Sequence, residues 1–124
     1  MADTEELLGK GVALFNDGLF WEAHEAWEEA WTPDRHGPDR GFWKGLIQLA
    51  AGCLHYTRRN RRGAVNKWRS GLEYLEPYLP EHHGLPLEAL HDAVADRLDE
   101  LENGEWGELA LPPLRVRGKP PPGA

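Results

Sequence analysis

The chain carries an internal repeat with a spacing of 41 residues. Four positions are identical in the two copies: Leu8 and Leu49, Gly11 and Gly52, Ala23 and Ala64, and Trp27 and Trp68. In addition, Phe15 falls on another large aromatic residue, Tyr56. A unit that recurs along a chain can bury its apolar face against its neighbour, so the repeat predicts two helix pairs with similar packing.

Each copy places a Gly in its first segment, and an Ala followed four residues later by Trp in its second segment. This arrangement resembles the tetratricopeptide helix–turn–helix unit. The Gly allows two helix backbones to approach, the small Ala lies at the crossing, and the aromatic ring fills the space beside it. We therefore expect two tetratricopeptide-like units within residues 4–78.

Apolar residues with helical spacing, separated by Gly, Pro and Asn, predict about five helices. They are expected over residues 4–16, 19–31, 39–59, 62–78 and 86–102. Thr4 and Asp39 are suitable N-caps for the first and third of these helices. Because no stretch alternates apolar and polar residues over a useful length, strands are not expected. The predicted fold class is all-α.

The C-terminal segment differs in composition from the helical part. Half of the ten prolines lie within residues 112–122, and the chain ends in Arg-Gly-Lys-Pro-Pro-Pro-Gly-Ala. Such a segment cannot bury an apolar face of its own. We expect a single helical domain at residues 1–103, followed by an extended or disordered Pro-rich tail at residues 104–124.

Length and charge limit the class of protein. The 124 residues are enough for one domain, and 21 acidic against 14 basic residues leave a net charge of -7, which excludes a generally basic nucleic-acid binder. The apolar runs are too short to span a membrane, and the N-terminus lacks the plan of a signal peptide. The single cysteine, Cys53, excludes an internal disulfide. We therefore expect a soluble cytoplasmic domain.

The second predicted helix carries a polar pair on its apolar side. On a helical wheel His24 lies within the apolar face, and Glu28 lies on the rim of that face. Residues four apart are neighbours on a helix surface, so the two side chains can meet. Since Glu22, Glu25 and Glu29 face away from this side, the wheel selects Glu28 among the glutamates.

The repeat identifies two further polar residues. Three polar residues correspond to apolar residues of the other copy: His24 to Val65, Gln48 to Leu7, and His55 to Leu14. Gln48 and His55 are seven apart, hence on one face of the third helix, where small glycines could leave a hollow. We predict a polar pocket between the second and third helices formed by His24, Glu28, Gln48 and His55, with Arg40 as an outer member.

Several roles are open to these residues. His24, Glu28 and His55 are a reasonable set of ligands for a divalent metal ion such as zinc. A histidine beside a carboxylate could also perform general acid–base chemistry near neutral pH. Alternatively, the histidine and the glutamate only satisfy each other's hydrogen-bonding groups. No cofactor other than a divalent metal is suggested by the residues.

Arginines are concentrated in the turn between the third and fourth helices, at Arg58, Arg59, Arg61 and Arg62. They could bind a phosphate or an acidic partner, and they are equally typical of a charged turn in solvent. Nucleic-acid binding through this turn together with Arg115, Arg117 and Lys119 of the tail is not expected, because the net charge of the chain is -7.

Segments of the chain resemble a known family. They are Glu22-Ala-His-Glu-Ala-Trp-Glu28, Gly45-Leu-Ile-Gln-Leu-Ala-Ala51 and Asn60-Arg-Arg-Gly-Ala64. In combination they resemble the bacterial domain-of-unknown-function family 309, over residues 5–78. The resemblance implies a small all-helical domain and no established reaction. It also places the hallmark polar positions of the family at His24, Glu25, Glu28, Gln48 and His55, so that Glu25 becomes a candidate by resemblance alone.

Two kinds of function therefore compete. In the first, the polar pocket takes a small ligand or a metal ion, or performs acid–base chemistry. In the second, the chain is a helical-repeat module that binds a protein partner or forms a homo-oligomer, and the polar cluster is structural. Repeat arrays normally need three or more units, so self-association would supply the stacking surface that two units lack.

Overall fold

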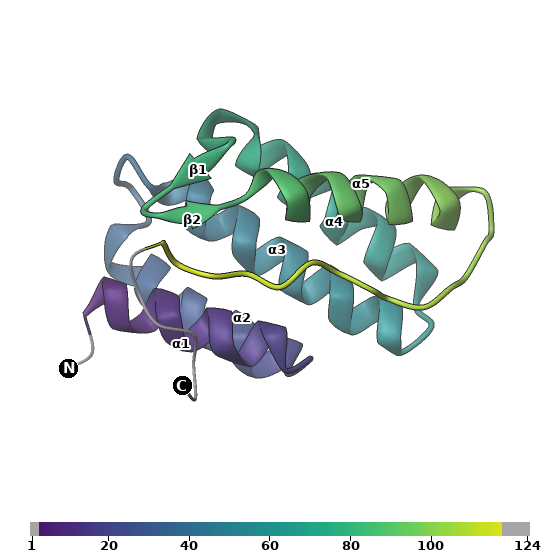
Figure 1. The fold of residues 1–124 in the computed structure, drawn as a ribbon, viewed down its shortest axis with the longest axis horizontal. Helices are drawn as coiled ribbons and strands as arrows, with labels where there is room; N and C mark the ends of the chain where they lie inside the picture. Colours follow the sequence, from purple (N-terminus) through teal and green to yellow (C-terminus); the bar gives the residue numbers. More distant parts are fainter. Residues whose placement is uncertain (1–2, 118–124) are drawn as a thin grey trace.

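The computed structural model describes residues 3–117 of the chain. Its five α-helices are α1 (Thr4–Asn16), α2 (Phe20–Trp31), α3 (Arg40–Thr57), α4 (Arg61–Leu75) and α5 (Glu88–Glu102) (Figure 1). Short 3-10 turns follow two of the helices, η1 (Thr32–Asp34) and η2 (Glu76–Tyr78). The strands β1 (Glu81–His82) and β2 (Leu85–Pro86) form a small antiparallel hairpin. The fold is all-α, as predicted, and no helix within residues 3–117 has the length and apolarity needed to cross a membrane.

Capping side chains explain where two of the helices begin. Asp3, rather than the predicted Thr4, caps α1, and its carboxylate accepts a hydrogen bond of 2.8 Å from the backbone N–H of Glu6. Asn60 caps α4 in the same way, accepting from the N–H of Gly63 at 3.1 Å. Each cap satisfies an N–H group that the helix itself leaves without a partner.

The fourth and fifth helices are shorter than predicted. The α-helical part of α4 ends at Leu75 and continues as the 3-10 turn η2, which contains Pro77 near its start. Proline lacks the N–H that a continuing α-helix requires. The last helix begins at Glu88 rather than at Pro86, because Pro86 belongs to β2.

Each helix packs against the next one along the chain. In the first pair the indole of Trp27 covers Gly11 so closely that a Cβ at this glycine would overlap the ring. In the second pair Trp68 covers Gly52 in the same manner. Both indoles are fully buried. The equivalence of these two contacts, which the repeat predicts, is therefore confirmed.

The small hairpin contradicts the expectation that no strands form. Each strand has two residues, and His82 pairs with Leu85. The turn between the strands consists of His83 and Gly84, with left-handed φ values of 51° and 73°, as in a two-residue type I′ turn. Strands of two residues are too short to show an alternating pattern, so the sequence carries no periodic signal for them.

Residues 105–117 form an extended strap that returns along the helices towards the hairpin (Figure 1, yellow). The hydroxyl of Tyr56 donates to the carbonyl of Gly107 and accepts from its N–H, both at 2.8 Å. The side chain of Asn16 makes an equivalent pair of 2.8 Å bonds with the backbone of Leu114, whose side chain is buried. The segment has no helix or strand and contributes Leu114 to the core. The remainder of the tail predicted at residues 104–124, residues 118–124, lies outside the described part.

Candidate metal centre

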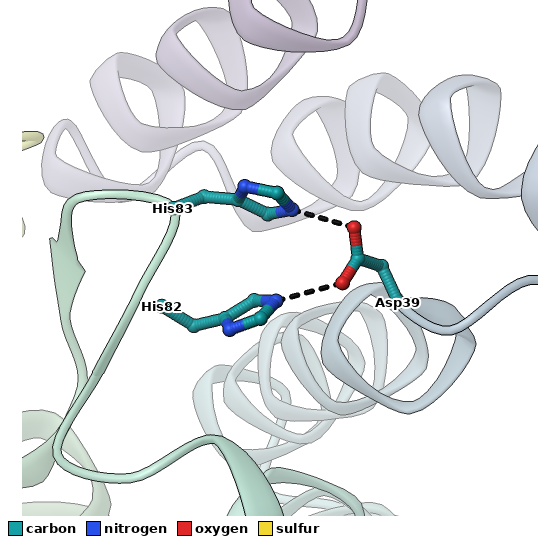
Figure 2. A group of neighbouring side chains, drawn as sticks. All are labelled: Asp39, His82 and His83. Atoms are coloured by element: carbon teal, nitrogen blue, oxygen red, sulfur yellow. Dashed lines mark hydrogen bonds and ion pairs between the residues drawn. The ribbon is translucent and has the colours of Figure 1, made fainter.

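Three side chains that are distant in the sequence meet beside the hairpin (Figure 2). Nε2 of His82 lies 2.7 Å from Oδ1 of Asp39, and Nε2 of His83 lies 2.6 Å from Oδ2. A carboxylate only accepts hydrogen bonds, so both imidazoles donate. Within residues 3–117 this is the one group of three or more His, Cys, Asp and Glu side chains whose possible ligand atoms all lie within 4.8 Å of one another.

Asp39 occupies the N-cap position of α3 without capping the helix. Its carboxylate makes no hydrogen bond to the helix N–H groups, and its two oxygens face the two histidines instead (Figure 2). The preceding residue is held by the hydroxyl of Tyr78, which donates to the carbonyl of Pro38 at 2.9 Å. The prediction that Asp39 caps α3 is thus correct for its position and wrong for its interaction, because the imidazoles take the carboxylate oxygens.

His83 adopts a backbone conformation that is uncommon for a residue with a side chain. Its φ of 51° lies in the left-handed region, which costs a free energy on the order of 1 kcal/mol outside glycine. Asn or Gly is preferred at this position of the turn. The hydrogen bond from this imidazole to Asp39 offsets part of the cost of the strained backbone.

The hairpin that carries the histidines is held on two sides. The N–H of Leu87, a fully buried residue, donates to the carbonyl of Pro80 at 2.8 Å. From the strap, the N–H of Arg117 donates to the carbonyl of Gly84 at 2.6 Å, and its guanidinium lies 3.0 Å from the carboxylate of Glu81. These contacts close the base of the hairpin and join its turn to the strap.

Aromatic rings hold the two imidazoles in place. The ring of Phe42, which is fully buried, has its centroid 4.9 Å from that of His82 and 5.5 Å from that of His83. The ring of Tyr78 lies 4.7 Å from His82. The side chains of Asp39, His82 and His83 keep 24%, 29% and 47% of their area exposed. The group is therefore ordered by packing and still accessible to an ion from solvent.

The electrostatics of the group favour a charged carboxylate. Burial by itself would raise the pKa of Asp39, because desolvation disfavours the ionised form. The hydrogen bonds from His82 and His83, with the coulombic attraction of both rings, outweigh burial and leave this pKa below its usual value. Asp39 is consequently ionised at neutral pH, which is the form that binds cations.

Asp39 and His83 line a cleft of about 750 Å³. Apolar side chains from α1, α3 and the strap form much of its wall: Leu8, Val12, Trp43 and Val116. Its other charged lining residues are Glu5, Asp34 and Arg115. A cleft of this size and lining is typical of sites for small organic molecules.

Two imidazole nitrogens and a carboxylate oxygen are a donor set that zinc and related divalent ions prefer. Three protein ligands leave coordination positions for water or for a ligand, as in catalytic rather than structural zinc sites. Without an ion, the same three groups join the hairpin to the start of α3 through two hydrogen bonds.

The structure places the predicted pair on α2 as the wheel indicated. Nε2 of His24 lies 3.3 Å from Oε2 of Glu28, and the imidazole stacks on the indole of Trp21 with ring centroids 5.1 Å apart. Nδ1 of His24 is buried and has no hydrogen-bond partner within residues 3–117. Glu28 is 52% exposed, and Glu25 is also exposed on this helix.

The other predicted residues have different neighbours. Gln48 and His55 are both half-buried on α3, and Nδ1 of His55 lies 3.1 Å from the side-chain amide of Asn60. Arg40 is exposed, with its guanidinium over the ring of Tyr74.

The structure brings together only part of the predicted pocket. In the described part of the chain, no hydrogen bond or ion pair joins His24 or Glu28 to Gln48 or His55. The possible ligand atoms of His24, Glu28 and His55 do not all lie within 4.8 Å of one another, in contrast to those of Asp39, His82 and His83. Their roles in a pocket or a metal site stay predictions.

The arginine-rich turn is partly occupied by contacts within the protein. Arg61 donates from Nε and from a terminal nitrogen to the carbonyls of the last two residues of α5, at 2.9 and 2.7 Å. It thereby satisfies carbonyls that the helix end leaves free. Arg59 lies over the ring of Trp106. Within residues 3–117, Arg58 and Arg62 are exposed without such a contact, so the predicted anion binding would depend mainly on them.

Sequence reasoning missed the group of Asp39, His82 and His83. Its strongest signal in the sequence is the pair of adjacent histidines followed by Gly84, which we interpreted only as a connection between helices. The carboxylate lies 43 residues before His82, and no helical or strand spacing relates the two. Their meeting depends on how the hairpin folds back over α3.

A known protein family matches part of this chain. A family model described as "Domain of unknown function (DUF309)" matches residues 8–66, which confirms the resemblance. The matched region extends from α1 into α4 and includes Asp39, but it includes neither His82 nor His83. No curated protein matches the chain.

Proposed function

We propose that this protein, which carries a DUF309 domain at residues 8–66, binds a divalent transition-metal ion through Asp39, His82 and His83. The observation that carries the proposal is the convergence of two imidazole nitrogens on one ionised carboxylate, each within 2.7 Å of an oxygen. The strained backbone of His83 supports it, because a turn selected for stability alone would favour Asn or Gly.

The distances fit an ion after a small outward movement. Ligand atoms about 2.1 Å from an ion lie about 3.0 Å apart in octahedral geometry and about 3.4 Å apart in tetrahedral geometry. The present separations of 2.7 and 2.6 Å, each to a different oxygen of Asp39, would have to widen by less than 1 Å for an ion held by both carboxylate oxygens. A hairpin turn whose histidine side chain is 47% exposed has room for that movement.

The open positions of the ion would face the cleft. Asp39 and His83 both line it, so water or a ligand bound to the ion enters the same space. Such a site supports two kinds of chemistry, polarisation of a bound carbonyl and activation of a bound water.

Calorimetric titration of the metal-free protein with Zn²⁺, and visible absorption with Co²⁺, test the proposal. The wild type is expected to bind one ion. His82→Ala and His83→Ala should each weaken binding by about 100-fold or more, because each removes a ligand and not merely a supporting contact.

His91→Ala is the matched control. His91 lies on α5 with Nδ1 3.2 Å from the carboxylate of Asp92, so it forms a His–Asp pair outside the group, and its loss should leave the affinity unchanged. His24→Ala and His55→Ala test the pocket predicted from the sequence. Failure of the wild type to bind, or loss of binding only in these last two variants, would overturn the assignment to Asp39, His82 and His83.

As a second candidate we propose a helical-repeat interaction module that self-associates. Leu19 and Trp21, at the start of α2, are 45% and 51% exposed, and they are the exposed large hydrophobic residues of the described part. Tetratricopeptide-like units need a neighbour to cover their outer surface, and a second copy would supply one. Light scattering should then show a dimer that Trp21→Ser converts to a monomer; a monomeric wild type would contradict this candidate.

A further inference from the structure

We propose that the cleft beside Asp39 and His83 binds a small monocarboxylate with an apolar body, whose carboxylate is held by the metal ion and by Arg115. This inference rests on the metal site proposed above. It adds the class of ligand, and it is argued from the chemistry of the cleft lining.

The wall of the cleft favours an apolar body. Leu8 and Val12 come from successive turns of α1, Trp43 comes from the first turn of α3, and Val116 comes from the strap. These side chains offer no strong hydrogen-bonding group apart from the indole N–H. Leu8, Val12 and Trp43 are almost fully buried and Val116 is half-buried, so the body of a ligand would meet the apolar edges of these side chains and would cover apolar surface mainly at Val116.

The polar groups of the cleft define the head of the ligand. Arg115 is a lining residue that makes no hydrogen bond or ion pair within residues 3–117, whereas Arg117 of the same strap is paired with Glu81. A guanidinium matches a carboxylate through two parallel hydrogen bonds. An ion on Asp39 and His83 would offer its open positions to the same kind of group.

The strap places Arg115 between two fixed points. On one side Leu114 is bound through its backbone to Asn16 on α1, and on the other Arg117 is bound to Gly84 in the turn that carries His83. The backbone at Arg115 is therefore held between α1 and the turn that carries His83.

The charge of the lining limits the ligand to one negative charge. Glu5 makes an interaction of its own. The other fixed charges of the lining are the carboxylates of Asp34 and Asp39 and the guanidinium of Arg115, so a bound dication brings their sum to +1 when His83 is neutral. One further anionic group is tolerated, whereas a dianion such as a phosphate monoester would meet uncompensated repulsion. The inference accordingly names a monocarboxylate and not a phosphate.

Calorimetry with sodium octanoate as the probe tests the inference, using octylamine and octanol as comparison compounds of equal chain length. Zn²⁺-loaded protein is expected to bind octanoate at least about tenfold more tightly than metal-free protein, a difference of about 1.4 kcal/mol. Octanol should bind more weakly than octanoate and without dependence on zinc. Arg115→Gln should weaken octanoate binding about five- to tenfold and leave the affinity for Zn²⁺ unchanged.

Arg58→Gln is the matched control, because Arg58 is also exposed and without an ion pair in the described part, but it does not line the cleft. Zn²⁺ binding without any preference for octanoate over octanol, or with a preference for octylamine, would overturn the inference while the metal site stands. Absence of Zn²⁺ binding by the wild type would overturn the metal site itself and this inference with it.

Discussion

The protein contains two arrangements of histidine and carboxylate that are built in different ways. His24 and Glu28 lie one helical turn apart on α2, and the helix alone brings them together. Asp39, His82 and His83 come from the start of α3 and from a hairpin turn more than 40 residues later. The local pair leaves its carboxylate 52% exposed, whereas the long-range group encloses Asp39 to 24% exposure between two donors.

This difference has an energetic meaning. A pair within one helix is already close in the unfolded chain whenever the helix forms, and an exposed ion pair contributes little to stability. A group assembled from distant segments exists only in the folded protein, so its hydrogen bonds report on tertiary structure. Substitutions in the two arrangements should therefore differ in size and in kind.

The labelling rate of Cys53 is expected to show the largest effect. It tests whether the core stays folded when a residue of either arrangement is substituted. Burial raises the pKa of this thiol to about 12. Compared with a free cysteine, the thiolate fraction at pH 8 falls roughly a thousandfold, and access is blocked as well. Labelling with a disulfide reagent such as DTNB should be slower than in guanidinium by at least that factor. Rapid labelling of the native wild type would contradict the burial of Cys53.

The next effect compares the two carboxylates. Asp39→Ala should lower the free energy of unfolding of the metal-free protein by about 2 kcal/mol, because two charge-assisted hydrogen bonds are lost from a partly buried site. Glu28→Ala should lower it by less than about 0.5 kcal/mol, as expected for an exposed pair. Urea unfolding at neutral pH measures both values. Equal losses would remove the distinction between the local and the long-range arrangement.

Asp39→Ser separates capping from the interaction with the histidines. Serine is a good N-cap, but its single hydroxyl oxygen cannot take the places of the two carboxylate oxygens that accept from separate imidazoles. If this variant regained the stability lost in Asp39→Ala, then capping of α3, and not the histidine contacts, would be the role of Asp39.

An effect smaller than that of Asp39→Ala concerns the backbone that carries the histidines. Gly84 and Gly18 both have left-handed φ values, 73° and 78°, and neither has an atom within 3.4 Å of the position of a Cβ. Gly84→Ala and Gly18→Ala should each lower stability by about 1 kcal/mol, since alanine disfavours this conformation. Only Gly84→Ala should also weaken Zn²⁺ binding, because Gly84 belongs to the turn that carries His83. Equal Zn²⁺ affinities in the two variants would show that the conformation of the turn does not affect Zn²⁺ binding.

Much of the fold was predictable because helix formation is largely local. The positions of α1, α2 and α3 follow from apolar spacing and from the breakers between them, and the predicted ends differ from the observed ends by at most two residues. The match of Gly11 with Trp27 and of Gly52 with Trp68 followed from the repeat, because equivalent residues in equivalent helix pairs meet the same neighbours. The pair of His24 and Glu28 was predictable for the same local reason.

The candidate metal centre was not predictable in this way. Asp39 has the sequence context of a helix cap, and His82 and His83 have that of a connecting segment. The capping preference was overridden because two imidazoles from the hairpin offered the carboxylate stronger, charge-assisted partners. The burial of Leu114 was not predictable for a similar reason, since it depends on packing against residues of the helical core that are distant in the sequence.

The sequence by itself determined an all-helical domain with two equivalent helix pairs, the Trp–Gly contacts within those pairs, and the polar pair on α2. These features depend on residues a few positions apart, whose relative placement the helix dictates. Only the tertiary structure decided that a hairpin turn would meet the start of α3, and that the strap would place Arg115 in the wall of the same cleft. Such contacts join segments with no common periodicity, so their geometry arises from the packing of the whole chain.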